Sequence, residues 1–356
     1  MKEENSNIRN EYIRDPLSRE IFSSLENEAS SQPVISPSTA MISAPERRLI
    51  TVPVVAILVG FLAYIVGYGT ITLNPPRDTA EVATESDNSL FLNDATLEAR
   101  AAYVYDVKND SVLYAHGGYE VLPLASLTKL MAALVVSETL PKDAVVTITA
   151  NDIKTEGDTG LRVGERWNLS DIIGFTLMTS SNDGASALAS AAGSLGQTMY
   201  EIPAEQARAD FVNKMNTKAE ELGLRGTRFF NGTGLDLNGE ISGGYGTARD
   251  VALLMAEAVR TMYDDLSITA LPQTSISSLA NIRHVSTNTN EYVGRIPNLI
   301  ASKTGYTDLA GGNLVIAFDA GLMRPIIISV LGSSREGRFT DVEKLVWATL
   351  ESITRE

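Results

Sequence analysis

Two residues three positions apart, Ser126 and Lys129, form the first pair in this sequence that could do covalent chemistry. They stand in LPLASLTKLMAALVV (residues 122–136), a run in which Lys129 is the only charge. On a helix, side chains at i and i+3 project from the same side. Burial lowers the pKa of a lysine, so that its neutral amine can take a serine proton near pH 7. The pattern predicts a serine nucleophile with a lysine base. A lysine near the start of a helix that extends its amine into water would produce the same sequence pattern.

A second motif, Ser180-Ser181-Asn182, follows an apolar stretch and opens an alanine-rich run in GFTLMTSSNDGASALA (residues 174–189). The Ser180 hydroxyl could relay a proton from the lysine to a leaving amine. The Asn182 amide could orient both the lysine and a substrate backbone. Serine and asparagine are also favoured at helix N-termini, so this motif alone fits an ordinary helix cap equally well.

A third motif, Lys303-Thr304-Gly305, stands in IASKTGYTDLAGGNLVIAF (residues 300–318). A glycine lets a substrate backbone lie close against a strand, and the Thr304 hydroxyl and Lys303 charge can receive a carboxylate. Lys303 would also add positive charge near Lys129 and lower the pKa of Lys129 further. The alternative is a turn followed by a strand. The three motifs occur in order, 54 and then 123 residues apart, and this combination is far more specific than its parts.

Composition excludes several other classes of site. The chain has 356 residues and a formal net charge of −15, with no basic block, which argues against a nucleic-acid partner. It contains no cysteine, so disulfides, a thiol nucleophile and a cysteine-ligated metal are ruled out. Only two histidines occur, His116 and His284, which leaves few bases for a Ser-His-Asp triad and makes a histidine metal site unexpected. We expect no metal and no cofactor.

An uncharged stretch, Leu49–Pro76, is long enough to cross a bilayer as a helix. A cleaved signal peptide fits less well, because 48 residues precede the stretch and no A-x-A-like site follows it. A buried core helix also fits less well, because few such helices run this long without a charge. Arg47-Arg48 on its N-terminal side predict a cytoplasmic N-terminus. We therefore expect a disordered cytoplasmic tail (1–48), a transmembrane helix (49–73), a linker (74–89) and one extracytoplasmic domain (90–356).

The domain reads as an α+β fold. Strand-like runs at 101–107 and 111–115 flank a turn, and a second hairpin spans 313–318 and 325–332. Between them, apolar residues from Leu127 to Val135 follow a helical period with apolar residues on the other faces as well, which predicts a helix buried nearly all round. A final amphipathic helix is expected around 342–353. Strands at both ends with helices between predict an antiparallel sheet flanked by helices.

Together the motifs resemble the D-alanyl-D-alanine carboxypeptidases among the low-molecular-mass penicillin-binding proteins. The resemblance extends over residues 95–350 and includes LASLTKLMAALV, VGERWNLSDIIGFTLMTSSNDGASALA, FVNKMNTKAEELGLRGTRFFNGTGLD, GYGTARDVALLM and NTNEYVGRIPNLIASKTGYTDLAGGNLV. It implies a β-lactamase/transpeptidase-like fold, with a helical subdomain beside the antiparallel sheet.

The resemblance also implies a role for each motif. Ser126 would be the acylated nucleophile and Lys129 its general base. The second wall of the site would be Ser180 and Asn182, and the third wall would be Lys303, Thr304 and Gly305 on the sheet edge. The backbone N–H groups of Ser126 and Tyr306 would form the oxyanion hole. Arg338 matches the arginine that helps to hold the terminal carboxylate of the substrate, although a surface arginine is the other interpretation.

The activity implied is removal of the terminal D-Ala from peptidoglycan stem pentapeptides through an acyl-enzyme, with covalent inhibition by β-lactams. A DD-endopeptidase on the same fold, or a non-catalytic peptidoglycan-binding or β-lactam-sensing module, is the alternative. A β-lactamase is disfavoured because no E-x-x-L-N-like element follows Asn182. Two departures from the family pattern stand out. Asn182 is followed by Asp183-Gly184 where Asp-Ala is usual. Many members of the family continue with a β-rich domain and a C-terminal amphipathic anchor, whereas here we expect the N-terminal span to do the anchoring.

Overall fold

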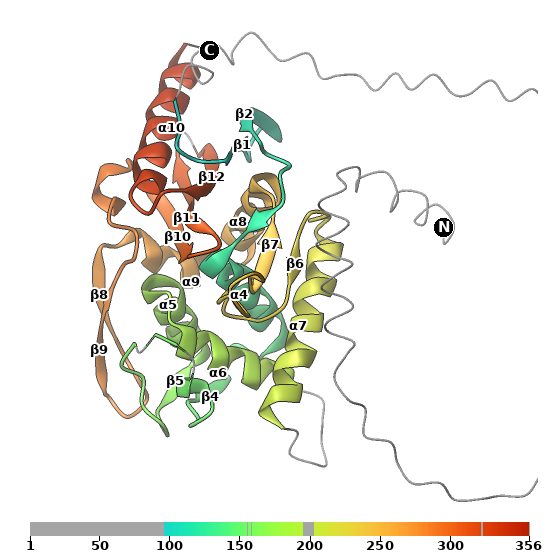
Figure 1. Ribbon diagram of the computed structural model, residues 1–356. Helices are drawn as coiled ribbons and strands as arrows, with labels where there is room; N and C mark the ends of the chain where they lie inside the picture. The colour runs from blue at the N-terminus through green and yellow to red at the C-terminus, as the bar shows by residue number, and fades with distance from the viewer. Residues whose placement is uncertain (1–95, 155, 158, 195–202, 322, 356) are drawn as a thin grey trace, which may run out of the picture. The chain divides into compact units, whose positions relative to one another are not determined.

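The computed structural model describes residues 96–154, 156–157, 159–194, 203–321 and 323–355 (Figure 1). All of them lie in one compact unit, Glu85–Glu356. The predicted tail (1–48), membrane span (49–73) and linker (74–89) lie outside the described residues. Within the described part of the chain, no helix is both long and apolar enough to cross a membrane.

A five-stranded antiparallel sheet forms one layer of the domain, and both predicted hairpins belong to it. Its strand order is β10-β11-β12-β1-β2, which leaves β10 at an edge. The strands are β1 (Ala101–Asp106), β2 (Ser111–His116), β10 (Leu299–Thr307), β11 (Gly311–Asp319) and β12 (Pro325–Ser333). The chain thus brings strands from both ends of the domain together, as their positions in the sequence predicted.

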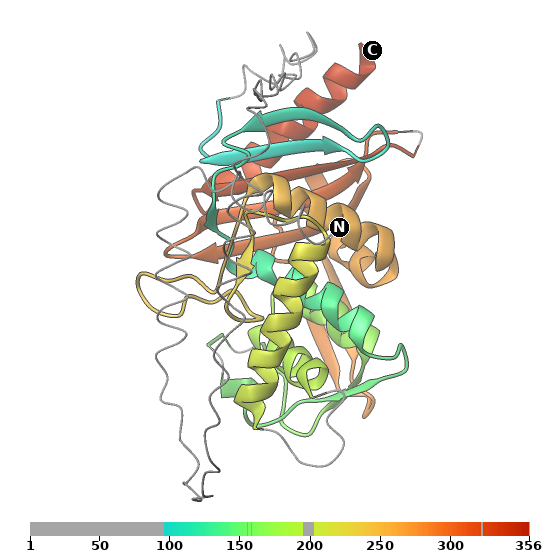
Figure 2. The ribbon, with the colours of Figure 1, turned by 90° about the vertical axis from the view of Figure 1, so that its right-hand side faces the viewer.

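Alternation along the strands gives the sheet two apolar faces. Ala101 and Tyr103 belong to the core that includes α8 (Ala248–Thr261), whereas Ala102 and Val104 belong to the core that includes α10 (Gly337–Thr354). Successive side chains of a strand point to opposite faces, so a strand buried on both faces needs apolar residues at every position. Figure 2 shows α8 and α10 on opposite sides of the sheet. The predicted α+β fold is therefore confirmed.

The helical part of the domain surrounds α4 (Thr128–Thr139). This helix contacts α5 (Leu169–Thr179), α6 (Asn182–Gly193), α7 (Ala204–Glu221) and α8. Residues 128–136 of α4 are all buried, which confirms the prediction of a helix covered nearly all round. The helix that carries Lys129 is therefore the core of the helical subdomain, held in place by its neighbours on every side.

Shorter elements complete the described chain. Three small sheets are formed by β3-β7-β6, β4-β5 and β8-β9. The bounds of these elements are β3 (Leu122–Pro123), η2 (Ala125–Leu127), β4 (Val145–Thr147), η3 (Asp152–Lys154), β5 (Arg166–Asn168), β6 (Arg228–Phe229), β7 (Gly244–Gly246), α9 (Tyr263–Ser267), η4 (Ile268–Ala270), β8 (Gln273–Ser277), β9 (Arg283–Thr287) and η5 (Val293–Arg295).

The two histidines differ in burial and in their contacts. His116 is exposed at the end of β2. His284 is buried in β9, where its Nε2 lies 3.0 Å from Glu165 Oε2 and its ring packs against those of Trp167 and Phe175. His284 thus joins the β8-β9 hairpin to the start of β5.

Candidate active site

Ser126 lies in the 3₁₀ helix η2, which leads directly into α4. The sequence predicted Ser126 and Lys129 on a single helix, but the chain tightens at the serine and becomes α-helical only at Thr128. The preceding residue, Ala125, has φ 48°, in the left-handed region. That conformation costs an alanine roughly 1–2 kcal/mol and is held by the surrounding structure.

Two glycines allow other backbone segments to pack against this turn. A Cβ on Gly234 would lie 1.9 Å from the Ala125 carbonyl oxygen, and a Cβ on Gly305 would lie 3.2 Å from Ser126 N. Neither position has room for a side chain unless backbone moves. The nucleophile's turn is therefore clamped between the loop after β6 and the edge strand β10.

Lys129 is 1% exposed, and its amine has three close oxygen neighbours. Its Nζ lies 2.8 Å from Ser126 Oγ, 2.7 Å from Asn182 Oδ1 and 2.6 Å from the carbonyl oxygen of Thr233. Burial lowers the pKa of Lys129 from 10.5 to about 7. At pH 7 such an amine is neutral in about half of the molecules, whereas an amine with a pKa of 10.5 is neutral in roughly one in 3,000.

The three neighbours determine where the lone pair of a neutral Lys129 points. A neutral amine has two N–H donors and one lone pair. The Asn182 Oδ1 and Thr233 carbonyl oxygens can only accept hydrogen bonds, so they take the two N–H groups. The lone pair is then left for the third neighbour, and the Ser126 hydroxyl can donate to it. The site therefore holds the base in the orientation needed to remove the Ser126 proton.

The Thr233 carbonyl is fixed by Asn231, which the sequence motifs did not single out. Asn231 Oδ1 accepts from Thr233 N at 3.1 Å and from Gly234 N at 2.7 Å, while its Nδ2 donates to the Leu235 carbonyl at 2.9 Å. Gly234 has φ 77°, a conformation that suits glycine. The run NGTGL (residues 231–235) is the local sequence signal for this turn. The acceptor itself is a backbone carbonyl, which every residue has, so the sequence does not single it out.

The second motif lies at the junction of α5 and α6. Ser180 ends α5 with φ 58°, and Ser181 caps α6 by accepting from Gly184 N at 2.9 Å. The cap interpretation thus holds for Ser181, while its two neighbours face the lysines. Asn182 contacts Lys129 through Oδ1 and donates through Nδ2 to the Glu156 carbonyl at 2.6 Å. Ser180 Oγ accepts from Lys303 Nζ at 2.9 Å.

The unusual Asp183-Gly184 step has a packing reason. A Cβ on Gly184 would lie only 2.2 Å from the Oγ1 of Thr176, one turn before the end of α5. An alanine at this position would collide with that hydroxyl. The departure from the usual Asp-Ala therefore follows from the neighbouring threonine and leaves Asn182 in place.

The third motif lies within β10, so the turn interpretation is wrong. Lys303 is 1% exposed and donates to Ser180 Oγ and, at 2.8 Å, to the Thr304 carbonyl. Burial first, and then the charges of Lys129 and Arg338, hold the pKa of Lys303 well below its usual range. The repulsion between the two lysines that the sequence predicted is present, and it lowers the pKa of Lys303. Because the repulsion is mutual, the site disfavours simultaneous charges on Lys129 and Lys303 unless an anion binds beside them and offsets the repulsion.

Arg338 lies near the first turn of α10 and is 6% exposed. Its Nη1 donates to the Gly305 carbonyl at 2.8 Å, and its buried Nε has no hydrogen-bond partner among the described residues. The surface interpretation of Arg338 is therefore wrong, because the guanidinium lies against the third motif. An unpaired buried N–H is costly, and a carboxylate is the acceptor that a guanidinium suits best.

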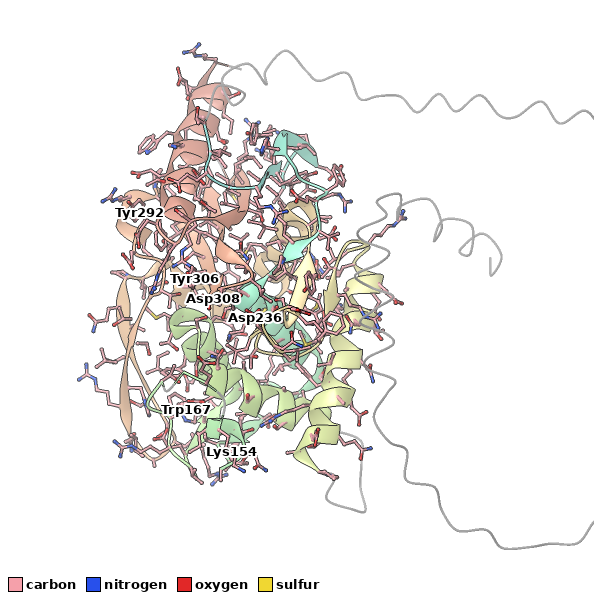
Figure 3. The ribbon with its side chains drawn as sticks, viewed as in Figure 1. Lys154, Trp167, Asp236, Tyr292, Tyr306 and Asp308 are labelled. Carbon is pink, nitrogen blue, oxygen red and sulfur yellow. The ribbon has the colours of Figure 1, made fainter. Side chains whose placement is uncertain are left out.

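Tyr306 follows Gly305 in β10 and is 44% exposed, and the Arg335 guanidinium carbon lies 5.2 Å from the centre of its ring. Its neighbour Thr307 donates to Asp236 Oδ1 at 3.1 Å, which ties the end of β10 to the loop after β6. Figure 3 shows Tyr306, Asp308 and Asp236 close together in this region. The predicted oxyanion donors, the N–H groups of Ser126 and Tyr306, thus belong to two segments that pack against each other at Gly305.

The sequence matches the peptidase family S11, described as D-alanyl-D-alanine carboxypeptidase, over residues 87–335. The chain belongs to this family. The resemblance inferred from the three motifs is therefore confirmed. In the described residues, Lys129 is hydrogen-bonded to Ser126 and Asn182, and Lys303 to Ser180. The charge of Lys129 acts on Lys303, which places the two groups in one site.

The chain is similar both to proteins named D-alanyl-D-alanine carboxypeptidases and to proteins named D-alanyl-D-alanine endopeptidases. The D-alanyl-D-alanine carboxypeptidase DacF of Bacillus subtilis is 28% identical over 258 residues, 70% of this chain and 61% of the relative. A D-alanyl-D-alanine endopeptidase of Pseudomonas aeruginosa is 32% identical over 230 residues, 62% of this chain and 67% of the relative. The chain thus spans about three fifths to two thirds of the length of these relatives.

Solved structures support the same fold. A D-alanyl-D-alanine carboxypeptidase from Mycobacterium tuberculosis superposes with a TM-score of 0.62 at 26% identity, covering 72% of this chain and 92% of that one. Penicillin-binding protein D2 of Listeria monocytogenes, in its ampicillin-bound form, has a TM-score of 0.57 at 28% identity and covers 72% and 98%.

Proposed function

We propose that this protein is a serine-type D-Ala-D-Ala carboxypeptidase that trims peptidoglycan stem pentapeptides through an acyl-enzyme. One observation carries the proposal: the amine of the buried Lys129 lies 2.8 Å from Ser126 Oγ and has two other neighbours that can only accept. That arrangement provides an activated hydroxyl near neutral pH without a histidine. Family membership adds the substrate class.

The chemistry proceeds in two halves. Ser126 Oγ attacks the carbonyl of the penultimate D-Ala while its proton passes to Lys129 Nζ. The N–H groups of Ser126 and Tyr306 stabilise the oxyanion, and the departing D-Ala amine takes a proton from the ammonium of Lys129, with Ser180 as the relay. Water then attacks the ester with Lys129 again as the base, and Ser126 regains its proton when the shortened peptide leaves.

Substrate binding uses the edge of the sheet. β10 is an edge strand, so a peptide can lie along it while Gly305 allows close approach. Thr304, Lys303 and Arg338 would receive the terminal carboxylate, which offsets the repulsion among the positive charges there. A β-lactam carries a carboxylate beside its reactive carbonyl, so we expect it to acylate Ser126. The ampicillin-bound relative from L. monocytogenes supports this expectation.

DD-endopeptidase activity is the second candidate, favoured by the relative from P. aeruginosa that bears this name at 32% identity. The same catalytic groups would then cleave a cross-link in which the D-Ala nitrogen belongs to a neighbouring stem. Both reactions share the acyl-enzyme and differ in the leaving group.

The deciding experiment incubates the purified full-length protein with a mixture of pentapeptide muropeptide monomers and cross-linked dimers, followed by mass spectrometry. Loss of one alanine from the monomers, absent with Ser126→Ala, supports the carboxypeptidase. Conversion of dimers to monomers supports the endopeptidase instead. No change in either, from a folded protein, contradicts both and favours a non-catalytic peptidoglycan-binding or β-lactam-sensing module.

We propose further that residues 49–73 anchor the protein as a single-pass membrane helix, with the tail in the cytoplasm and the catalytic domain outside. Support comes from the uncharged stretch of 28 residues at 49–76 and the two arginines before it. Protease added to intact protoplasts should remove the catalytic domain and spare a tag at the N-terminus. Protection of the catalytic domain in intact protoplasts would contradict this topology.

A further inference from the structure

The hydroxyl of Thr304 has a close neighbour that none of the three motifs contains. Thr289 Oγ1 lies 2.6 Å from Thr304 Oγ1, and either oxygen could be the donor. Thr289 follows β9 and is half-buried, whereas Thr304 is 3% exposed. Two hydroxyls at this distance share one hydrogen bond, so the direction of the Thr304 proton depends on Thr289.

The backbone around Thr289 is held by hydrogen bonds to several elements. Thr289 N donates to the Met178 carbonyl at 3.2 Å, two residues before Ser180. The buried side chain of Asn288 donates to the carbonyls of Thr269 and Leu271 at 2.7 and 2.9 Å. The Thr289 hydroxyl therefore stands at a fixed place between the second and third walls of the site.

The same anchor reaches β10 directly. Thr269 Oγ1 accepts from the backbone N of Ser302 at 3.0 Å, and the Thr269 carbonyl accepts from Ser302 Oγ at 2.9 Å. Ser302 is the residue before Lys303. The segment that carries Thr289 and the strand that carries Thr304 are thus hydrogen-bonded to the same residue, Thr269, and this fixes the spacing between the two hydroxyls.

We propose that Thr289 is a positioning residue for substrate recognition: its hydroxyl donates to Thr304 Oγ1 and so directs the Thr304 proton toward the terminal carboxylate of the substrate. This inference rests on the proposed function, which supplies the carboxylate. A hydroxyl carries a single proton, and an ionised carboxylate can only accept. Thr304 can therefore donate to the carboxylate only if it accepts from Thr289.

The opposite direction would work against binding. If Thr304 donated to Thr289, its lone pairs would face the incoming anion and repel it. The arrangement Thr289 to Thr304 to carboxylate polarises each hydroxyl in turn, which strengthens the final hydrogen bond. Arg338 contributes charge at this corner, and the two threonines contribute direction. Thr289 thus increases the preference of the enzyme for substrates with a free terminal carboxylate.

The test compares Thr289→Val, which keeps the shape and removes the hydroxyl, with Thr289→Ser, which keeps the hydroxyl. Full-length protein is assayed on a peptide ending in D-Ala-D-Ala and on the same peptide with a C-terminal carboxamide. We expect Thr289→Val to lower kcat/KM on the free acid by about 5- to 10-fold, the effect of one hydrogen bond, and to change the value for the carboxamide by less than about twofold. Thr289→Ser should stay within about twofold of the parent on both peptides.

A structural role would give a different result. Loss of order around Thr289 would lower kcat/KM for both peptides equally and shift the melting temperature, and equal losses overturn the inference. An unchanged free-acid value in Thr289→Val, or a loss in Thr289→Ser as large as in Thr289→Val, also overturns it. Failure of the proposed function looks different again, because the parent protein itself would cleave neither peptide, and the inference would fall with it.

Discussion

Placing a negative charge beside Lys129 is the sharpest perturbation that the site offers. Asn182 Oδ1 lies 2.7 Å from Lys129 Nζ, so Asn182→Asp puts a carboxylate of the same shape against the amine. A carboxylate favours the ammonium form, which raises the pKa of Lys129. The acidic limb of the pH profile for acylation should therefore move to higher pH.

The size of the effect follows from the distance and the starting value. An opposite charge within about 4–6 Å shifts a pKa by roughly 1–3 units, which moves Lys129 from about 7 to between roughly 8 and 10. The neutral fraction at pH 7 then falls from about one half to between about one tenth and one thousandth. Acylation at pH 7 should slow by about 5- to 500-fold and recover as the pH rises.

The assay is the second-order rate of acylation by a fluorescent penicillin from pH 5 to pH 10. Asn182→Ala is the matched control, because it loses the same hydrogen bond from Nδ2 to the Glu156 carbonyl but adds no charge. It should lower the plateau without moving the limb to higher pH. A limb in Asn182→Asp that stays near pH 7, or moves lower, would refute the claim that neutral Lys129 is the base.

Three further substitutions test separate parts of the structure. Gly305→Ala places a Cβ 2.8 Å from the Leu124 carbonyl oxygen, so it should push β10 away from the nucleophile and slow acylation on the order of 100-fold, measured with the same penicillin. Asn231→Ala releases the Thr233 carbonyl from its turn, which should lower the acylation plateau on the order of 10-fold and move the limb to lower pH, because that carbonyl stabilises the ammonium. Asp341→Ala removes the acceptor of two backbone N–H groups and of Ser333 Oγ, and it should lower the free energy of unfolding by about 2–4 kcal/mol in urea while acylation persists.

Each of these has an outcome that counts against it. If Gly305→Ala were acylated at the parental rate, β10 would accommodate the added Cβ without moving away from the nucleophile, contrary to the prediction. An Asn231→Ala profile that loses activity with an unmoved limb would assign Asn231 to folding alone. For Asp341→Ala, an unfolding midpoint equal to that of the parent would show that water replaces the lost acceptor.

The features that could be predicted from the sequence are those that depend on the pattern of side-chain types along the chain. Alternating and continuous apolar runs predicted both hairpins, and the uninterrupted apolar faces of α4 predicted its burial. The lowered pKa of Lys129 follows from the same observation, because a charge in the first turn of a helix that is buried there has to be desolvated. Family membership could be read from the motifs because their types, order and spacing occur together.

What the sequence left open lies in backbone atoms and in contacts between distant segments. The Thr233 carbonyl that completes the surroundings of Lys129 is a backbone group, and Thr289 meets Thr304 only through folding. The left-handed turn at Ala125 follows from packing around Gly234, which no local propensity predicts.

The most direct test of the central claim is intact-protein mass spectrometry after brief exposure to ampicillin, followed by peptide mapping of the adduct. The proposed mechanism predicts a stoichiometric gain of one ampicillin mass, located on Ser126 and absent in Ser126→Ala, with Lys129→Met failing to form it at pH 7. An adduct on another residue, or one that forms in Lys129→Met at the parental rate, would contradict the assignment of Ser126 and Lys129 as the reacting pair.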